Sequence, residues 1–387
     1  MKVLRCEFRN IKLYNEDLVI DFIASDRVGE KEEVYKQSDI LNLQKVITIT
    51  ASTAAGKTVC LRLINFAFKL LEDNTALKEE KVDLSLLKED SEIIIDFILN
   101  NQIYRLKSII GIKETNIDLF STENKFYFKN EFIYKKDISS IKKDLDIFNW
   151  TDKNLLFERS KLGNNQISYL SSNHSMIIKI TKDTFFRYIP HIDQTNINTL
   201  AEGMRYDTPF INLFDNSLDK VEYKRNQNIK IKYKNENINY SLSDINDQFK
   251  LISSSTIKGT GILVLIAALF NAGGGYLIID EIEAHLNKTV VEFLIEIFMD
   301  ENINKNGSVL IFTTQYSELL DFIKRKDAIY VSTKDQNFNL KLEKLTDIIN
   351  HSEAKENKVL LSNYLKNTSL NSEVMQKIKE LLYSFQV

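Results

Sequence analysis

The segment best suited to bind a charged ligand consists of small residues followed by a lysine and a threonine. Its residues are Ala51, Ser52, Thr53, Ala54, Ala55, Gly56, Lys57 and Thr58. It matches the phosphate-binding pattern G-x-x-x-x-G-K-[ST] at every fixed position except the first, where Ala51 replaces glycine. In that pattern backbone N–H groups surround phosphate oxygens, Lys57 reaches the β- and γ-phosphates, and Thr58 holds Mg²⁺. The alternative is a small-residue turn that contains Gly-Lys-Thr by chance. A positive φ at Ala51 would cost about 1–2 kcal/mol.

Two adjacent carboxylates end an apolar segment far downstream, Leu277-Ile278-Ile279-Asp280-Glu281. A buried parallel strand delivers the residues at its carboxyl end into the ligand crevice of an α/β sheet. Asp280 is therefore a candidate to hold Mg²⁺, directly or through water, and Glu281 a candidate to polarise an attacking water. The competing interpretation is an acidic turn at the start of a helix, because Asp and Glu are common there.

Strands that alternate with helices are predicted around both segments. A β-branched strand at 45–50 enters the glycine-containing loop, and an apolar helix at 59–71 leaves it. This alternation predicts βαβ units and a parallel sheet covered on both faces. The elements predicted in the C-terminal part are helix 261–270, strand 276–280, helix 288–299, strand 309–314, helix 317–324, strand 328–332 and strand 340–345.

The N-terminal and middle parts predict a different organisation. Antiparallel strand pairs are expected at 3–8 with 18–22, and at 93–99 with 103–109 around the Asn100-Asn101 turn. A hairpin at 126–134, mixed helical segments and a strand pair at 229–242 are expected farther on. The expected divisions are an N-terminal lobe (1–112), an inserted and mostly helical subdomain (113–247), a C-terminal lobe (248–345) and a helical tail (346–387).

The composition is that of a globular protein with a substantial core. The 387 residues are 43% hydrophobic and 27% charged with a net charge of -3, so no overall basic field indicates nucleic acid. Two cysteines, Cys6 and Cys60, exclude a disulfide framework, and the histidines lack zinc-ligand spacing. Neither a signal peptide nor an apolar run of about 20 residues is recognised, which predicts a cytoplasmic protein without a membrane span.

Together these segments resemble the SMC/OLD-like branch of ABC-type ATPases, in particular the compact AAA-family ATPases of bacterial abortive-infection and anti-phage systems. The resemblance covers residues 1–110 and about 246–350. Residues 252–258 are similar to the family's signature segment, 282–286 to its D-loop, and 312–317 to its T-T-H switch.

The resemblance implies a P-loop NTPase of ABC-ATPase type with a mixed sheet, in which two protomers enclose ATP and Mg²⁺. The signature serines would contact the γ-phosphate bound by the opposite protomer; they are Ser253, Ser254 and Ser255. Gln315 stands in place of the switch histidine, and Ser255 stands where glycine is usual. The alternative interpretation uses local structure alone: the serines are an N-cap at the start of a helix, and Gln315 is a polar residue at the end of a strand. The family's glutamine switch has two candidates, Gln102 and Gln166.

The departures at Ala51, Ser255 and Gln315 suggest slow hydrolysis, or ATP that acts chiefly to join two protomers. We therefore expect a homodimer or higher homo-oligomer, with Glu281 and Gln315 as catalytic candidates. The resemblance also implies a sensor or regulatory role. Only about 40 residues follow the last predicted strand, too few for an effector domain, so we expect the effector to be a separate protein.

Two other functions are compatible with the sequence. A DNA-engaging clamp would need coiled-coil arms or a basic surface. Basic clusters at 135–136, 142–143 and 324–326 are its candidates, although such clusters are more often solvated surface. The other alternative is a nucleotide-binding scaffold without turnover. Residues 359–387 predict amphipathic helices that dock on the sheet or bind a partner.

Overall fold

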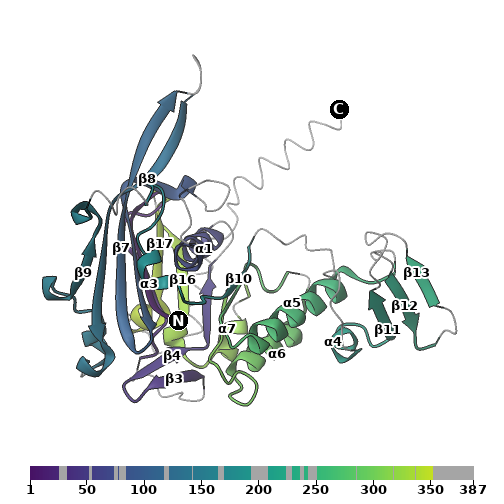
Figure 1. Ribbon diagram of the computed structural model, residues 1–387. Helices are drawn as coiled ribbons and strands as arrows, with labels where there is room; N and C mark the ends of the chain where they lie inside the picture. The colour runs from purple at the N-terminus through teal and green to yellow at the C-terminus, as the bar shows by residue number, and fades with distance from the viewer. Residues whose placement is uncertain are drawn as a thin grey trace.

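The computed structural model describes residues 1–25, 33–51, 55–73, 77, 84–116, 122–141, 143–163, 170–192, 208–223, 229–235, 239–242, 251–284, 286–316, 318–335 and 337–351. Within these ranges the fold consists of two six-stranded sheets, a three-stranded sheet and a two-stranded sheet (Figure 1). The α-helices in the described ranges are α1 (Lys57–Asp73), α3 (Ile178–Thr181), α4 (Thr208–Asn212), α5 (Ser254–Asn271), α6 (Lys288–Met299), α7 (Glu318–Phe322) and α8 (Leu345–His351).

The first sheet is antiparallel, with the strand order β2-β1-β6-β7-β8-β9. Both predicted strand pairs are confirmed, because β1 pairs with β2 and β6 with β7. Asn100 and Asn101 have φ values of 49° and 59°, the left-handed values that a two-residue type I′ turn requires. The strands are β1 (Lys2–Ile11), β2 (Leu18–Asp21), β6 (Leu87–Leu99), β7 (Gln102–Asn116), β8 (Thr122–Asp137) and β9 (Leu155–Glu158).

The hairpin expected at 126–134 is wrong, because β8 passes through these residues as a single long strand. Ile109 pairs with Asn130 while Ile110 pairs with Phe128, which leaves Lys129 as an extra residue. An extra residue of this kind is a β-bulge, which bends a strand without ending it. The strand therefore bends at Lys129 and continues, and no turn divides it.

The second sheet contains the phosphate-loop strand, in the order β10-β14-β15-β5-β16-β17. Every pairing is parallel except β16 with β17, so the predicted βαβ alternation is confirmed. The strands are β5 (Val46–Thr50), β10 (Tyr188–His191), β14 (Tyr276–Ile279), β15 (Val309–Thr314), β16 (Ile329–Lys334) and β17 (Leu340–Lys344). A separate hairpin of β3 (Val34–Ser38) and β4 (Leu41–Gln44) lies beside the first sheet (Figure 1).

Apolar cores cover both faces of the second sheet, as the continuous apolar strands predict. Ile278 points into a core shared with α1 and the first sheet, whereas Leu277 and Ile279 point into one shared with α5, α6 and α7. Successive side chains of a strand face opposite sides, so β14 is buried twice. Its carboxyl end is consequently held firmly in place.

The insert is not mostly helical in its described part, which corrects that expectation. Its regular structure is largely strand, and α3 and α4 are single short turns of helix. β7 crosses the boundary expected at residue 112, and β10 forms the edge of the second sheet. The predicted pair at 229–242 is confirmed within a three-stranded sheet of β11 (Leu218–Tyr223), β12 (Ile229–Tyr233) and β13 (Asn239–Leu242). In Figure 1 this sheet lies at the right of the view, beyond one end of α5 and away from the two six-stranded sheets.

Helix α5 begins at Ser254, well before the predicted start at residue 261. Gly259 lies inside this helix, and a larger residue would not fit there because a Cβ would be only 2.1 Å from the Phe214 ring. This close approach attaches the turn before β11 to α5. Within the described part of the chain, α5 is the one helix long and apolar enough to cross a bilayer, and half of it is buried inside the protein. Buried core helices share this property.

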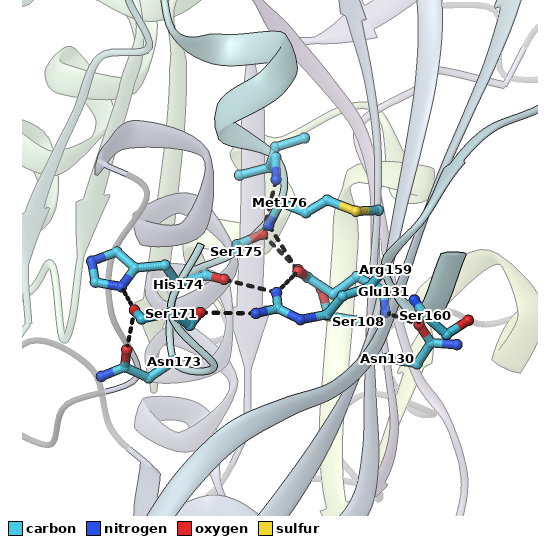
Figure 2. A network of polar contacts seen from close by, with 11 residues as sticks. Ser108, Asn130, Glu131, Arg159, Ser160, Ser171, Asn173, His174, Ser175 and Met176 are labelled. Atoms are coloured by element: carbon cyan, nitrogen blue, oxygen red, sulfur yellow. Dashed lines mark hydrogen bonds and ion pairs between the residues drawn. The ribbon is translucent and has the colours of Figure 1, made fainter. Parts of the chain in front are cut away.

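A buried ion pair joins the insert to the first sheet (Figure 2). Glu131 on β8 accepts hydrogen bonds from the Arg159 guanidinium at 2.6 Å, the Ser175 hydroxyl at 2.6 Å and the Met176 N–H at 2.7 Å. Arg159 also donates to the carbonyls of Ser171 and His174. Burial raises the pKa of Glu131, and these partners oppose the rise. The network fixes the segment that leads into α3 and then into β10.

Candidate nucleotide site

The phosphate loop has the strand–loop–helix geometry that its motif requires. β5 ends at Thr50, the buried Ala51 follows it, and α1 begins at Lys57. Gly56 has a φ of 86°, whereas Ala51 has no positive φ, so the alanine at the first motif position causes no strain of that kind. A Cβ at Gly56 would also lie 2.4 Å from Leu340 Cδ1. The other predicted loop residues, 52–54, lie outside the described residues.

Lys57 is buried at the first turn of α1. Its ammonium donates a hydrogen bond at 3.1 Å to the carbonyl of Ala51, the first residue of the phosphate loop. Burial lowers the pKa of Lys57, while the carboxylates of Glu283, Glu281 and Asp280 oppose that effect. A phosphate at the helix N-terminus would offer this ammonium a stronger partner than a carbonyl.

The structure brings the phosphate loop and the acidic strand end together. Thr58 Oγ1 donates to Asp280 Oδ2 at 2.7 Å, although the two residues are 222 positions apart. The other oxygen, Oδ1, accepts from Thr313 Oγ1 at 2.5 Å. The Asp280 N–H donates to the carbonyl of His191 on β10. Groups from α1 and β15 therefore contact the Asp280 carboxylate, and β10 contacts its backbone.

The oxygens of Thr58 and Asp280 suit a hard divalent cation. Mg²⁺ prefers oxygen ligands, and it is usually bound by one or two carboxylates together with substrate phosphates. A hydroxyl and a carboxylate in direct contact at the phosphate loop match this donor set. In the described ranges, no group of three or more His, Cys, Asp or Glu side chains gathers as a separate metal site.

Glu281 adopts a left-handed backbone conformation, with a φ of 48°. Such a conformation costs a non-glycine residue about 1–3 kcal/mol and recurs at functional sites. The Glu281 N–H donates to Thr313 Oγ1 at 2.7 Å, and the Gln315 side-chain amide donates to Glu281 Oε1 at 3.3 Å. The Gln315 backbone N–H donates to Glu283 Oε1 at 2.6 Å. The predicted catalytic pair is thus in contact.

A pocket of about 490 Å³ joins these groups. Binding pockets for small molecules span about 300–1,000 Å³, so this one is large enough for a nucleotide. Besides predicted site residues, its lining includes side chains from two distant turns. The lining residues are Leu13, Ala55, Gly56, Lys57, Thr58, Val59, Glu281, Gln315, Lys334, Phe338 and Leu340.

The signature serines lie outside this pocket lining, at the start of α5. Ser253 is the N-cap residue, and its hydroxyl accepts from the Thr256 N–H at 3.2 Å. Ser254 is exposed and Ser255 is half-buried. The local N-cap interpretation is therefore confirmed for Ser253, and contact with a partner's nucleotide stays a prediction.

The remaining sequence candidates lie away from the pocket or outside the described residues. Gln102, a candidate glutamine switch, donates to Asp137 on the first sheet and does not line the pocket. The other candidate, Gln166, and the D-loop residue His285 lie outside the described residues. The same is true of the tail helices expected at 359–387.

Two of the basic clusters considered for DNA are occupied by interactions within the fold. Lys136 donates to the carbonyls of Asp146 and Asn149. Arg325 is buried and paired with Asp327, and Lys326 donates to two carbonyls at the end of α7. Lys136, Arg325 and Lys326 thus have partners within the fold, which favours a structural role for these three side chains.

Sequence reasoning missed several residues of the site. Thr313 lies in the switch segment 312–317, which assigns it no function, yet it contacts both Asp280 and Glu281. Leu13, Phe338 and Leu340 line the pocket without any local motif. His191 reaches the site because β10 pairs with β14. Only the strand order reveals these neighbours.

No protein-family model and no curated protein sequence matches the chain. Among solved structures, the SMC head domain from Thermotoga maritima is similar to this chain, with a TM-score of 0.42 and 13% sequence identity. The similarity covers 89% of this chain and 99% of that domain.

Proposed function

We propose that this chain is a Mg²⁺-dependent ATPase of the ABC type with slow turnover. The observation that carries the proposal is the chain of contacts Thr58–Asp280–Thr313–Glu281. It connects the threonine after a phosphate-loop lysine to two acidic residues at the end of β14, a parallel strand separated from β5 by β15 alone. This is the arrangement in which a hydroxyl and a carboxylate share a metal beside a triphosphate.

Each residue has a distinct task in the proposed reaction. Lys57 and the N–H groups at the start of α1 bind the β- and γ-phosphates. Thr58 and Asp280 would hold Mg²⁺, which when bound neutralises charge on the phosphates. Glu281, which faces the same pocket, orients the attacking water in line with the γ-phosphorus.

Slow turnover is supported by the environment of Glu281. Its carboxylate already accepts a hydrogen bond from Gln315, a residue that donates through an amide and does not exchange a proton as imidazole does. Gln315 therefore orients Glu281 and does not replace a histidine chemically. A turnover rate typical of an active ATPase would contradict this part of the proposal.

We further propose that ATP joins two protomers. In the open pocket one side of a γ-phosphate would stay in contact with water, and a second protomer closes such a site. The exposed N-terminus of α5, with Ser254 at its surface, supports this role because it offers helix N–H groups and hydroxyls to an anion. Differential affinity of ATP for the closed state would then drive assembly.

The proposed biological role is that of a sensor or regulatory subunit in a bacterial anti-phage system with a separate effector. Its support is the resemblance of the signature, D-loop and switch segments. Plating of phage on cells that carry the gene with its genomic neighbours tests this role. Protection that is lost in the Lys57→Ala variant is expected, and protection that persists would contradict a role for nucleotide.

Calorimetry and sedimentation test the molecular proposal. Wild type is expected to bind Mg-ATP and Lys57→Ala to lose binding. Glu281→Gln is expected to sediment as a dimer only with ATP. Ser254→Arg in the Glu281→Gln background should stay monomeric, while Thr289→Arg, at an exposed position of α6, serves as the matched control. Equal dimer content with and without ATP would contradict the proposed assembly.

A further inference from the structure

Part of the pocket lining comes from two turns that carry no phosphate-binding motif. Leu13 lies in the connection between β1 and β2, while Phe338 and Leu340 lie at the turn and strand after β16. We refer to these three side chains as the apolar wall. Phe338 is 78% exposed and Leu13 is 52% exposed, which is unusual for large apolar side chains in one pocket.

The fold holds both turns rigidly in uncommon conformations. Leu13 and Phe338 have φ values of 72° and 64°, a left-handed region that bulky residues rarely adopt. The Leu340 N–H donates to the Leu13 carbonyl at 2.7 Å, which ties one turn to the other. Backbone strain of this kind persists only where the surrounding structure enforces it, and it recurs at ligand-binding sites.

Asp335 shapes the turn that carries the aromatic ring. Its carboxylate accepts hydrogen bonds from the Asn337 and Asn339 N–H groups, both at 2.8 Å, and from the Asn339 side-chain amide at 3.0 Å. The Phe338 N–H donates to the Asp335 carbonyl at 3.1 Å. Hydrogen bonds to Asp335 therefore fix the backbone on both sides of Phe338.

The apolar wall is continuous with the phosphate loop. Leu340 packs so closely on Gly56 that a Cβ at that glycine would be 2.4 Å from Leu340 Cδ1. A triphosphate held by Lys57 and Thr58 would thus have its remaining part beside this wall, inside the same pocket of about 490 Å³. An apolar, aromatic surface at that place fits a nucleobase, because every base has a π-face that stacks on aromatic side chains.

We propose that Phe338 and Leu13 bind the base of a nucleoside triphosphate by stacking and apolar contact. The proposal rests on the proposed function and assigns its base-binding residues. Among the described lining residues, Lys334 at the end of β16 is the one polar side chain from outside the phosphate loop, α1 and the ends of β14 and β15. Hydrogen bonds to the edge of a base would be needed to distinguish adenine from guanine, so the apolar wall binds both bases alike.

Calorimetric binding of three Mg²⁺-bound probes tests the assignment on the full chain. The probes are ATP, GTP and inorganic tripolyphosphate, which has the phosphates without a base. The variants are Phe338→Ala, Phe338→Trp, Leu13→Ala and Lys57→Ala. Phe185→Ala is the matched control because Phe185 is 81% exposed and does not line the pocket.

Phe338→Ala is expected to weaken ATP and GTP binding by on the order of tenfold, the usual effect of losing one stacked aromatic. Leu13→Ala should weaken both in the same direction, and Phe338→Trp should restore wild-type affinity. Tripolyphosphate binding and the Phe185→Ala variant should be unchanged. ATP and GTP should bind wild type within about threefold of each other.

Distinct results would overturn the two proposals separately. Unchanged ATP binding by Phe338→Ala, or an equal loss for ATP and tripolyphosphate, would overturn the base-binding role while leaving the proposed function intact. A strong preference for ATP over GTP would overturn the claim of low base selectivity. Failure of wild type to bind any of the three probes would overturn the proposed function, and the inference with it.

Discussion

Replacing Thr313 with valine tests how the acidic residues are positioned. The substitution keeps the shape of a fully buried side chain and removes the hydroxyl that joins Asp280 to the Glu281 backbone. Asp280 Oδ1 loses its donor at 2.5 Å, and the Glu281 N–H loses its acceptor at 2.7 Å. The effect therefore measures two hydrogen bonds without a change of packing.

The expected magnitude follows from these two contacts. A hydrogen bond to a charged group contributes about 1.5–3 kcal/mol, and a buried donor left without a partner costs about 1–3 kcal/mol. Burial of an additional methyl group offsets about 0.8 kcal/mol of this. We expect Thr313→Val to lower the free energy of unfolding by about 2–4 kcal/mol.

Activity should fall more than stability alone explains. Without the Thr313 hydroxyl, the Glu281 N–H loses a hydrogen bond that helps to hold the residue at its φ of 48°, a conformation that costs about 1–3 kcal/mol. A loss of that size in the transition state lowers kcat about 5- to 150-fold. Glu281 would still be present, so the residual activity should remain above that of Glu281→Gln.

Urea denaturation and steady-state ATP hydrolysis measure the two effects. Thr48→Val is the matched control, because Thr48 is buried on β5 and its hydroxyl has no hydrogen-bond partner in the described structure. This control should be neutral or slightly stabilising and should retain wild-type kcat. If Thr313→Val behaved like Thr48→Val in both assays, the positioning argument would be refuted.

Three further outcomes are expected. Arg159→Met leaves the Glu131 carboxylate buried without its charged partner and should lower the free energy of unfolding by about 3–5 kcal/mol. The double variant Arg159→Met, Glu131→Gln should recover part of this loss in urea denaturation. Additive effects of the two substitutions would contradict the pairing. Burial acts to raise the pKa of Asp21, but Lys344 and Arg5 hold this pKa below its ordinary value. The Asp21 carboxylate therefore stabilises the fold above about pH 4, and this stabilisation is lost as the pH falls through the lower folded-state pKa. The difference in unfolding free energy between wild type and Asp21→Asn should shrink below about pH 4, and a constant difference would argue against this linkage. Both cysteines are buried, and burial raises the pKa of Cys60 to about 12. A thiol reagent at neutral pH should therefore label neither cysteine in the native protein and both cysteines in denaturant. Rapid labelling of the native protein would contradict this expectation and show that the core opens.

Local sequence patterns predicted the second sheet well because its elements have strong periodicity. α6 and β15 have the predicted bounds, since continuous apolar strands and an amphipathic helix leave little choice of register. The phosphate loop and the acidic strand end were recognised as motifs, and parallel pairing brings them together. Here local pattern and overall fold agree.

The failures occurred where long-range pairing decides the structure. β10 contains Pro190 and is only four residues long, so it has little strand signal of its own; proline is tolerated there because β10 is an edge strand. The bulge at Lys129 resembled a turn because its polar residues interrupt an apolar alternation. Leu13 and Phe338 meet in one pocket only because Tyr14 bridges to Leu340. None of these pairings is encoded in a local motif.

Steady-state ATP hydrolysis by wild type, Lys57→Ala and Glu281→Gln, each with Mg²⁺ and with the metal chelated, tests the central claim most directly. That claim is that the phosphate loop and the end of β14 form one catalytic site. We predict slow turnover by wild type that requires Mg²⁺ and is lost in both variants. Turnover that persists at the wild-type rate in either variant would contradict the two-motif site.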